Sequence, residues 1–65
     1  MIKNNYKKIF LIGIGGIGMS ALAKFFIQKK KVVEGYDRIR SKITIELESL
    51  SCRIFYDESI LNISN

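Results

Sequence analysis

The residues best suited to chemistry form a glycine-rich segment, Gly-Ile-Gly-Gly-Ile-Gly at positions 13–18. The segment follows an apolar run of strand length, residues 9–12, and precedes a helix-like stretch. Gly13 permits an abrupt turn from strand to helix, Gly15 leaves room for a ligand against the main chain, and Gly18 lets the first helical turn lie close to the sheet. A turn of this kind is typical of sites that bind a phosphate or a diphosphate.

The amides at the start of the expected helix would attract such an anion. Those of Gly15, Gly16 and Ile17 would be unpaired and would face outward at the positive end of the helix dipole. An acid, Asp37, follows at the end of a second strand-like run, residues 32–36, at about the spacing found in nucleotide-binding folds. We therefore expect Asp37 to accept a hydrogen bond from the sugar or base of a nucleoside. A purely structural glycine turn, and an Asx turn at Asp37, are the alternatives.

The composition is that of a small globular domain. The 65 residues are 48% hydrophobic and 26% charged, but a chain of this size buries only about 60% of its unfolded surface. Histidine is absent and Cys52 is the one cysteine, which excludes an intramolecular disulfide, a Cys/His zinc site and a His-based triad within this sequence. We expect Cys52 to be a small, semi-buried residue beside the third strand rather than a catalytic thiol.

The net charge of +5 comes mainly from lysines at positions 3, 7 and 8 and from the lysine run at 29–31. The run falls where a helix should end, and cations there complement the helix dipole. Attraction of an anionic ligand or a nucleic acid is the alternative, but no aromatic residues are interleaved with these lysines. We therefore expect no nucleic-acid partner.

The basic start and the apolar stretch after it also resemble a secretory signal. Four glycines within six residues make a poor signal helix, and the pattern continues afterwards as strand and helix. Ser20 and Lys24 interrupt the roughly 20 apolar residues that a membrane span needs. The sequence thus predicts neither a secretory signal nor insertion into a membrane.

The rest of the pattern predicts the elements that would position the glycine segment and the acid. The run at 9–12 suits a parallel strand that is covered on both faces. In the helix that follows, we expect one apolar face to be core, with Lys24, Gln28 and Lys29 mostly toward solvent. The residues of that face are Ile17, Ala21, Leu22, Phe25 and Phe26.

A second helix is expected to begin at Ser41, which can act as its N-cap. Ile43, Leu47 and Leu50 fall on one face of this helix, and residues 53–56 form a short third strand. The order strand-helix-strand-helix-strand, with right-handed crossovers, predicts an α/β fold: the first, Rossmann-like half of a doubly wound parallel sheet with strand order 3-2-1. In such a sheet the glycine segment and the acid lie at the same edge.

The string from position 9 to position 23, together with Glu34-Gly35-Tyr36-Asp37, resembles the N-terminal start of the Mur ligases. The resemblance implies that the chain is an N-terminal Rossmann-like domain, here incomplete, that holds UDP-N-acetylmuramic acid. The reaction that it implies is the ATP-dependent joining of L-alanine to this UDP-sugar in peptidoglycan synthesis, in the cytoplasm. In this family the muramate carboxylate becomes an acyl phosphate, and the amine of L-alanine displaces the phosphate.

The resemblance can be carried over residue by residue to the substrate. The glycine-segment amides would face the diphosphate with the Ser20 hydroxyl nearby, and Asp37 and Arg38 would lie by the uridine. No catalytic residue and no metal ligand are implied. The residues assigned to UDP-sugar binding are Gly13, Gly15, Gly16, Ile17, Gly18, Ser20, Asp37 and Arg38.

ATP and Mg²⁺ serve the reaction in the family, but neither is expected to bind to these residues. A Walker-type G-x-x-x-x-G-K-[ST] string is absent, and the resemblance places ATP binding in a central domain, followed by a C-terminal domain, both after position 65. We therefore expect the 65 residues to be inactive alone. Lys30 and Ser51 stand where relatives tend to have glycine, so both helices are expected to end less sharply.

Two other interpretations remain open at this point. The first is an NAD(P)- or nucleotide-binding module of a dehydrogenase or sensor. In that module Asp37 would bind an adenosine ribose, and Arg38 would accommodate a 2′-phosphate. The second is a truncated relic without function. The continuation of the glycine segment through Met19 and Ser20 favours the Mur ligases over a nicotinamide enzyme.

Overall fold

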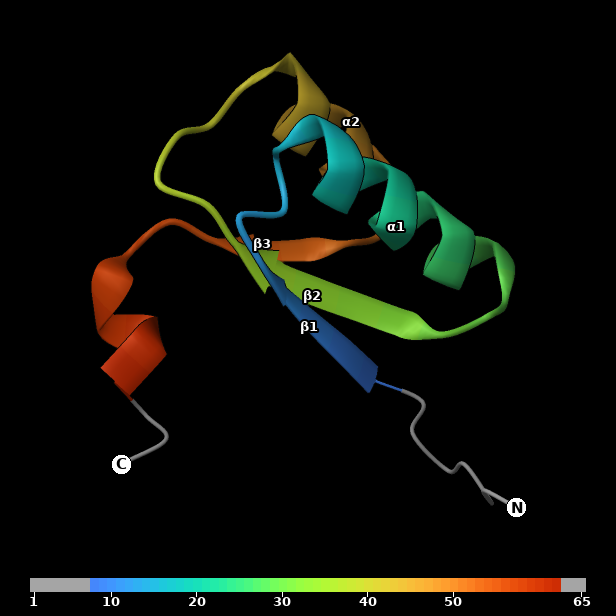
Figure 1. Ribbon diagram of the computed structural model, residues 1–65, viewed down its shortest axis with the longest axis horizontal. Coiled ribbons are helices and arrows are strands. Elements are labelled where there is room, and N and C mark those ends of the chain that lie inside the picture. The colour runs from blue at the N-terminus through green and yellow to red at the C-terminus, as the bar shows by residue number, and fades with distance from the viewer. Residues whose placement is uncertain (1–7, 63–65) are drawn as a thin grey trace.

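The computed structural model describes residues 8–62, which form a three-stranded parallel sheet with two crossover helices (Figure 1). The strands pair in the order β1-β2-β3, which is the predicted order 3-2-1, so the expected half of a doubly wound sheet is confirmed. The lysines at positions 3 and 7 lie outside the described residues. The elements are β1 Lys8–Ile12, α1 Ile17–Gln28, β2 Val32–Tyr36, α2 Lys42–Ser49, β3 Arg53–Phe55 and a 3-10 helix, η1, Glu58–Asn62.

The strand register brings the carboxyl ends of all three strands to one edge of the sheet. Ile12 pairs with Tyr36, and Tyr36 pairs in turn with Phe55. The chain that leaves β1 stays attached to β2, because the amides of Gly13 and Ile14 both donate to the Tyr36 carbonyl, at 2.8 and 3.1 Å. The segments that follow β1 and β2 therefore start from neighbouring points.

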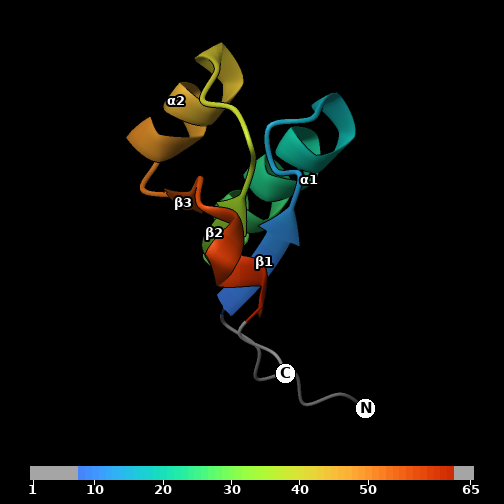
Figure 2. The same ribbon diagram turned by 90° about the vertical axis from the view of Figure 1, so that its left-hand side faces the viewer.

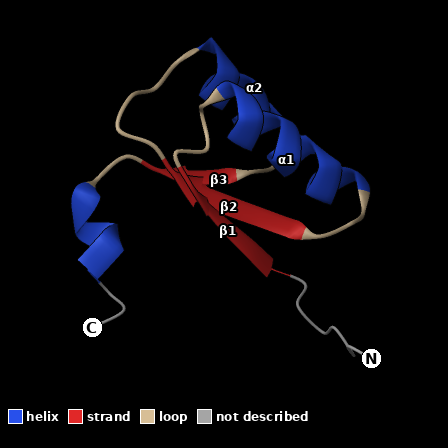
Figure 3. Cartoon of the chain, in the orientation of Figure 1, coloured by secondary structure: helices blue, strands red, loops and turns tan. Residues whose placement is uncertain are grey.

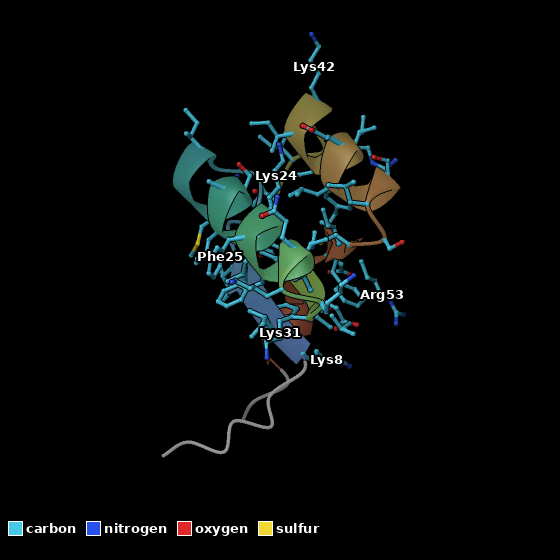
Figure 4. All side chains as sticks on the ribbon, turned by 90° about the vertical axis from the view of Figure 1, so that its right-hand side faces the viewer. Lys8, Lys24, Phe25, Lys31, Lys42 and Arg53 are labelled. Carbon is cyan, nitrogen blue, oxygen red and sulfur yellow. The ribbon has the colours of Figure 1, made fainter. Side chains whose placement is uncertain are left out.

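Both helices lie over the same face of the sheet (Figures 2 and 3). On their outer side, the Lys24 ammonium on α1 reaches toward α2 and lies 3.1 Å from the Glu46 carboxylate (Figure 4). No helix within the described residues is long and apolar enough to cross a membrane. The core between the helices and the sheet consists of Leu11, Ile14, Ala23, Val33, Leu47 and Cys52.

On the opposite face of the sheet, β1 has little cover from the described residues, although Tyr36 at the end of β2 is buried. Along β1 the side chains alternate: Leu11 is buried, whereas its neighbours Phe10 and Ile12 are 41% and 57% exposed. The expectation that this strand is covered on both faces is therefore wrong for this part of the chain. Apolar residues on both faces are what a parallel strand needs when helices cover both sides, and here helices cover one.

The face of α1 that packs on the sheet differs from the predicted face. Its buried residues are Ser20 and Ala23, and of the predicted set Phe26 packs against the core. Apolar side chains surround most of this helix, so their spacing did not identify the contacting side. Small side chains face the sheet because they let the helix approach it closely. The predicted core residues that are exposed instead are Ile17, Ala21, Leu22 and Phe25.

The second helix begins where the sequence predicts. The Ser41 hydroxyl accepts a hydrogen bond from the Thr44 amide at 3.3 Å, and the Thr44 hydroxyl accepts one from the Ser41 amide at 2.8 Å. This reciprocal pair is a capping box in which threonine replaces the usual glutamate or glutamine. The N-cap prediction for Ser41 is confirmed.

Both helices end sharply, contrary to expectation. Lys30 and Ser51 have φ angles of 67° and 74°, in the left-handed region that favours glycine. The Lys31 amide donates to the Phe26 carbonyl at 3.0 Å, and this bond, with that of Lys30 to Ile27, forms a Schellman motif. The same pair of bonds closes α2 around Ser51. The helix ends thus adopt the glycine geometry without glycine.

Candidate phosphate-binding site

The glycine loop, residues 13–16, is fixed to the end of β2 by backbone bonds. Gly13 has a φ of 77°, which confirms that this position needs a glycine for the turn. The Gly16 amide donates back to the Gly13 carbonyl at 2.9 Å. Between them, the Ile14 side chain is completely buried in the core. The loop is therefore a compact turn anchored by one apolar side chain.

Asp37 and Gly15, which the sequence places 22 positions apart, are in direct contact. The Oδ2 atom of Asp37 accepts a hydrogen bond from the Gly15 amide at 2.7 Å, and Oδ1 accepts one from the Ile39 amide at 3.2 Å. A Cβ at position 15 would lie 2.8 Å from Oδ2 and 2.9 Å from the Thr44 methyl group. Position 15 therefore needs a glycine because two other segments approach its backbone.

The N-terminus of α1 is open to an anion. Its N-cap, Gly16, has no side chain to cap the helix, and the first turn contains no acidic residue. The first amide with an intrahelical acceptor is that of Ser20, which donates to the Gly16 carbonyl at 2.8 Å. The amides of Ile17, Gly18 and Met19 have no acceptor among the described residues. The available amides thus begin at residue 17, because that of Gly15 is already bound to Asp37 and that of Gly16 to the loop itself.

The other assigned residues occupy different surroundings. Ser20 is buried, and its hydroxyl donates to the Ile17 carbonyl at 3.1 Å rather than facing the helix N-terminus. A Cβ at Gly18 would meet no atom within 4 Å, so the expectation of tight helix-to-sheet packing at this glycine is wrong. Arg38 is exposed beside Asp37. The ion pairs found within residues 8–62 do not involve its guanidinium.

Two residues that support the site were missed by the sequence analysis. At Gly35, in β2, a Cβ would lie 2.6 Å from both the Ile14 Cδ1 atom and the Leu11 carbonyl oxygen. A glycine inside a strand pattern is a signal of such a close approach. Thr44 is fully buried and places its methyl group against the loop. Its position three residues after an N-cap was the available signal, because this is where a capping box has its second member.

Two titratable groups near the core, Cys52 and Tyr36, have raised pKa values. Burial, and secondarily the charges of Glu48 and Glu34, raise the pKa of the Cys52 thiol. Burial, followed by the charge of Glu58, raises the pKa of Tyr36. Both groups are thus held in their neutral forms at neutral pH. In the part of the chain that the structure describes, no cluster of side chains is suited to hold a metal ion.

The fold and the loop define a class: an α/β domain of the doubly wound type whose first helix presents free amides at the sheet edge. Sequence comparison identifies the family. The protein-family sequence model described as "Mur ligase family, catalytic domain" matches residues 8–64. The chain belongs to the Mur ligase family.

Curated relatives agree with this assignment. The chain is 48% identical over 56 residues to the UDP-N-acetylmuramate–L-alanine ligase of Phocaeicola vulgatus. The aligned segment is 86% of this chain and 12% of that protein. It is 49% identical over 61 residues to the enzyme of the same name from Francisella philomiragia, and this aligned segment is 89% of this chain and 13% of the relative. The chain therefore spans about an eighth of the length of the curated relatives that it matches.

Proposed function

We propose that this chain is the N-terminal, Rossmann-like substrate-binding part of a UDP-N-acetylmuramate–L-alanine ligase and that it holds UDP-N-acetylmuramic acid. The observation that carries the proposal is the open N-terminus of α1, without a capping side chain or an acid in its first turn, in a chain 48% identical to a ligase of that name. Free helix N-terminal amides attract an anion through their hydrogen bonds and through the helix dipole.

In the proposed complex, the diphosphate lies against the first turn of α1. The amides of Ile17, Gly18 and Met19 donate to its oxygens, in a position two residues further along than the sequence alone indicates. The uridine lies toward the end of β2, where Arg38 is exposed and where the Asp37 carboxylate retains acceptor capacity beyond its two backbone bonds. The glycine loop, residues 13–16, supplies the backbone shape and Ser20 supports the first turn.

The chemistry of the proposed reaction takes place outside these residues. ATP and Mg²⁺ would activate the muramate carboxylate as an acyl phosphate, and the amine of L-alanine would then displace the phosphate. Neither a Walker-type string nor, among the described residues, a metal-binding cluster is present. The chain's own contribution is to bind and orient the UDP-sugar, in the cytoplasm, where we place the complete enzyme.

Titration of the ¹⁵N-labelled chain by NMR tests this proposal. We expect UDP-N-acetylmuramic acid to shift the amide signals of Ile17, Gly18 and Met19, and NAD to leave them in place. Shifts with NAD alone would instead support the nicotinamide alternative and overturn the proposal.

A matched pair of variants makes the test specific for charge. A Cβ at position 18 would meet no atom within 4 Å, and this position is exposed, so we expect both Gly18→Asp and Gly18→Asn to be accommodated. Asp near a helix N-terminus is stabilising by roughly 0.3–1 kcal/mol, and its like charge opposes a diphosphate at the same amides. We expect Gly18→Asp to lose binding and Gly18→Asn to keep most of it. Equal losses in both variants would show that charge at this turn does not govern binding.

A further inference from the structure

Two aspartates follow neighbouring strands of the sheet, Asp37 one residue after β2 and Asp57 two residues after β3, and they make different contacts. Asp37 follows β2 and Asp57 follows β3, and each accepts a hydrogen bond from the amide two residues later, at 3.2 Å from Ile39 and 2.9 Å from Ser59. Asp37 alone of the two also reaches back across the sheet edge to Gly15. The bond measures 2.7 Å, a length typical of a charge-assisted hydrogen bond.

With the bond from Gly15 to Asp37, every backbone amide of the glycine loop, residues 13–16, has a hydrogen-bond acceptor. The amides of Gly13 and Ile14 donate to the Tyr36 carbonyl, and that of Gly16 donates within the loop. Gly15 is the remaining loop amide, and the Asp37 carboxylate is its acceptor. Glycines lose more conformational freedom on ordering than other residues do, so a loop of this composition depends on each such bond for its shape.

We propose that Asp37 is a positioning residue: its carboxylate fixes Gly15, and through the adjacent N-cap Gly16 it fixes the direction of the first-turn amides of α1. The inference rests on the proposed function, because it concerns how the anion site is held in shape. The same negative charge occupies the Gly15 amide and directs a phosphate to the amides from residue 17 onward. Asp37 would then serve any anion at this site, whether or not the ligand carries a nucleoside.

The comparison of two ligands separates positioning from direct contact. The variant Asp37→Asn keeps the size of the side chain but offers one acceptor oxygen for two amides. We expect its affinity to fall about tenfold for UDP-N-acetylmuramic acid and by the same factor for inorganic pyrophosphate, since the loop would adopt its binding shape in a smaller fraction of molecules. The matched control Asp57→Asn removes the same carboxylate charge from a turn away from the loop, keeps an acceptor oxygen for its one amide bond, and should bind both ligands as the unchanged chain does.

Each outcome of this experiment has a defined meaning. A loss for the UDP-sugar with unchanged pyrophosphate binding would make Asp37 a nucleoside contact and overturn the inference while leaving the proposed function intact. Equal or tighter binding of pyrophosphate by Asp37→Asn would show that charge repulsion outweighs positioning, which also overturns it. If the unchanged chain binds neither ligand, the proposed function fails. The inference is then decided by hydrogen exchange, which should accelerate at the Gly15 amide in Asp37→Asn and not in Asp57→Asn.

Discussion

Replacing Lys30 and Ser51 by glycine should stabilise the protein. Both residues hold positive φ angles, 67° and 74°, at the ends of α1 and α2. The left-handed region costs a non-glycine residue roughly 1–2 kcal/mol, and glycine removes this cost. The greater conformational freedom of glycine in the unfolded chain offsets roughly 0.5–1 kcal/mol of that stabilisation. We therefore expect a net stabilisation of about 0.5–1 kcal/mol at each site. Because the two positions close different helices, the effects should add within about 0.5 kcal/mol.

Thermal and urea unfolding followed by circular dichroism measures this effect. For a domain of this size, 1 kcal/mol corresponds to a shift in Tm of roughly 4–8 °C, and the urea midpoint should rise with an unchanged m value. The alanine variant Lys30→Ala retains the strained backbone and should be nearly neutral. Gln28→Gly, in the last turn of α1, should destabilise by about 0.5–1 kcal/mol, since it places glycine in an ordinary helical position. If Lys30→Gly lowered Tm as Gln28→Gly does, backbone strain at the helix end would not be the controlling term.

Two further predictions concern the core. Gly35→Ala should cost about 1–3 kcal/mol in urea unfolding, because its Cβ meets the Leu11 carbonyl oxygen at 2.6 Å and a backbone atom cannot move aside; the open position in Gly18→Ala should show no such loss. The buried Cys52 thiol, whose pKa is raised by burial, should react slowly with a disulfide reagent in the folded chain and quickly in urea; equal rates would contradict its burial. Since the folded pKa lies above the unfolded one, this thiol contributes to stability fully below the unfolded pKa and loses that contribution as pH rises toward the folded value.

The order of the elements could be predicted from sequence because each carried a local signal. Strand-length apolar runs, the glycine turn and the Ser41 cap depend on neighbouring residues, and the structure confirms all three. The packing side of α1 could not be predicted in this way. Ile17 and Phe25 are as apolar as core residues, and Ser20 with Ala23 faces the sheet only because their small size permits close approach.

The candidate site was predictable in outline but not in its internal contacts. The sequence placed the glycine segment and Asp37 at one sheet edge, which the structure confirms. The bond between Asp37 and Gly15 depends on the register that pairs Ile12 with Tyr36. Parallel strands are joined by a long crossover rather than by a short turn, so no local turn in the sequence fixes that register. The roles assigned to Ser20 and Arg38 in ligand binding stay predictions.

The sheet edge at β1 has a consequence for how the chain behaves in concentrated solution. Within residues 8–62 this strand pairs with β2 alone, and its residues Phe10 and Ile12 are exposed on the uncovered face of the sheet. Such an edge is a template for pairing with another molecule. The net charge of +5 opposes the approach of copies, but about 0.1 M salt reduces the range of that repulsion to about 10 Å. The chain should therefore stay dispersed at low ionic strength and self-associate through β1 as salt is added.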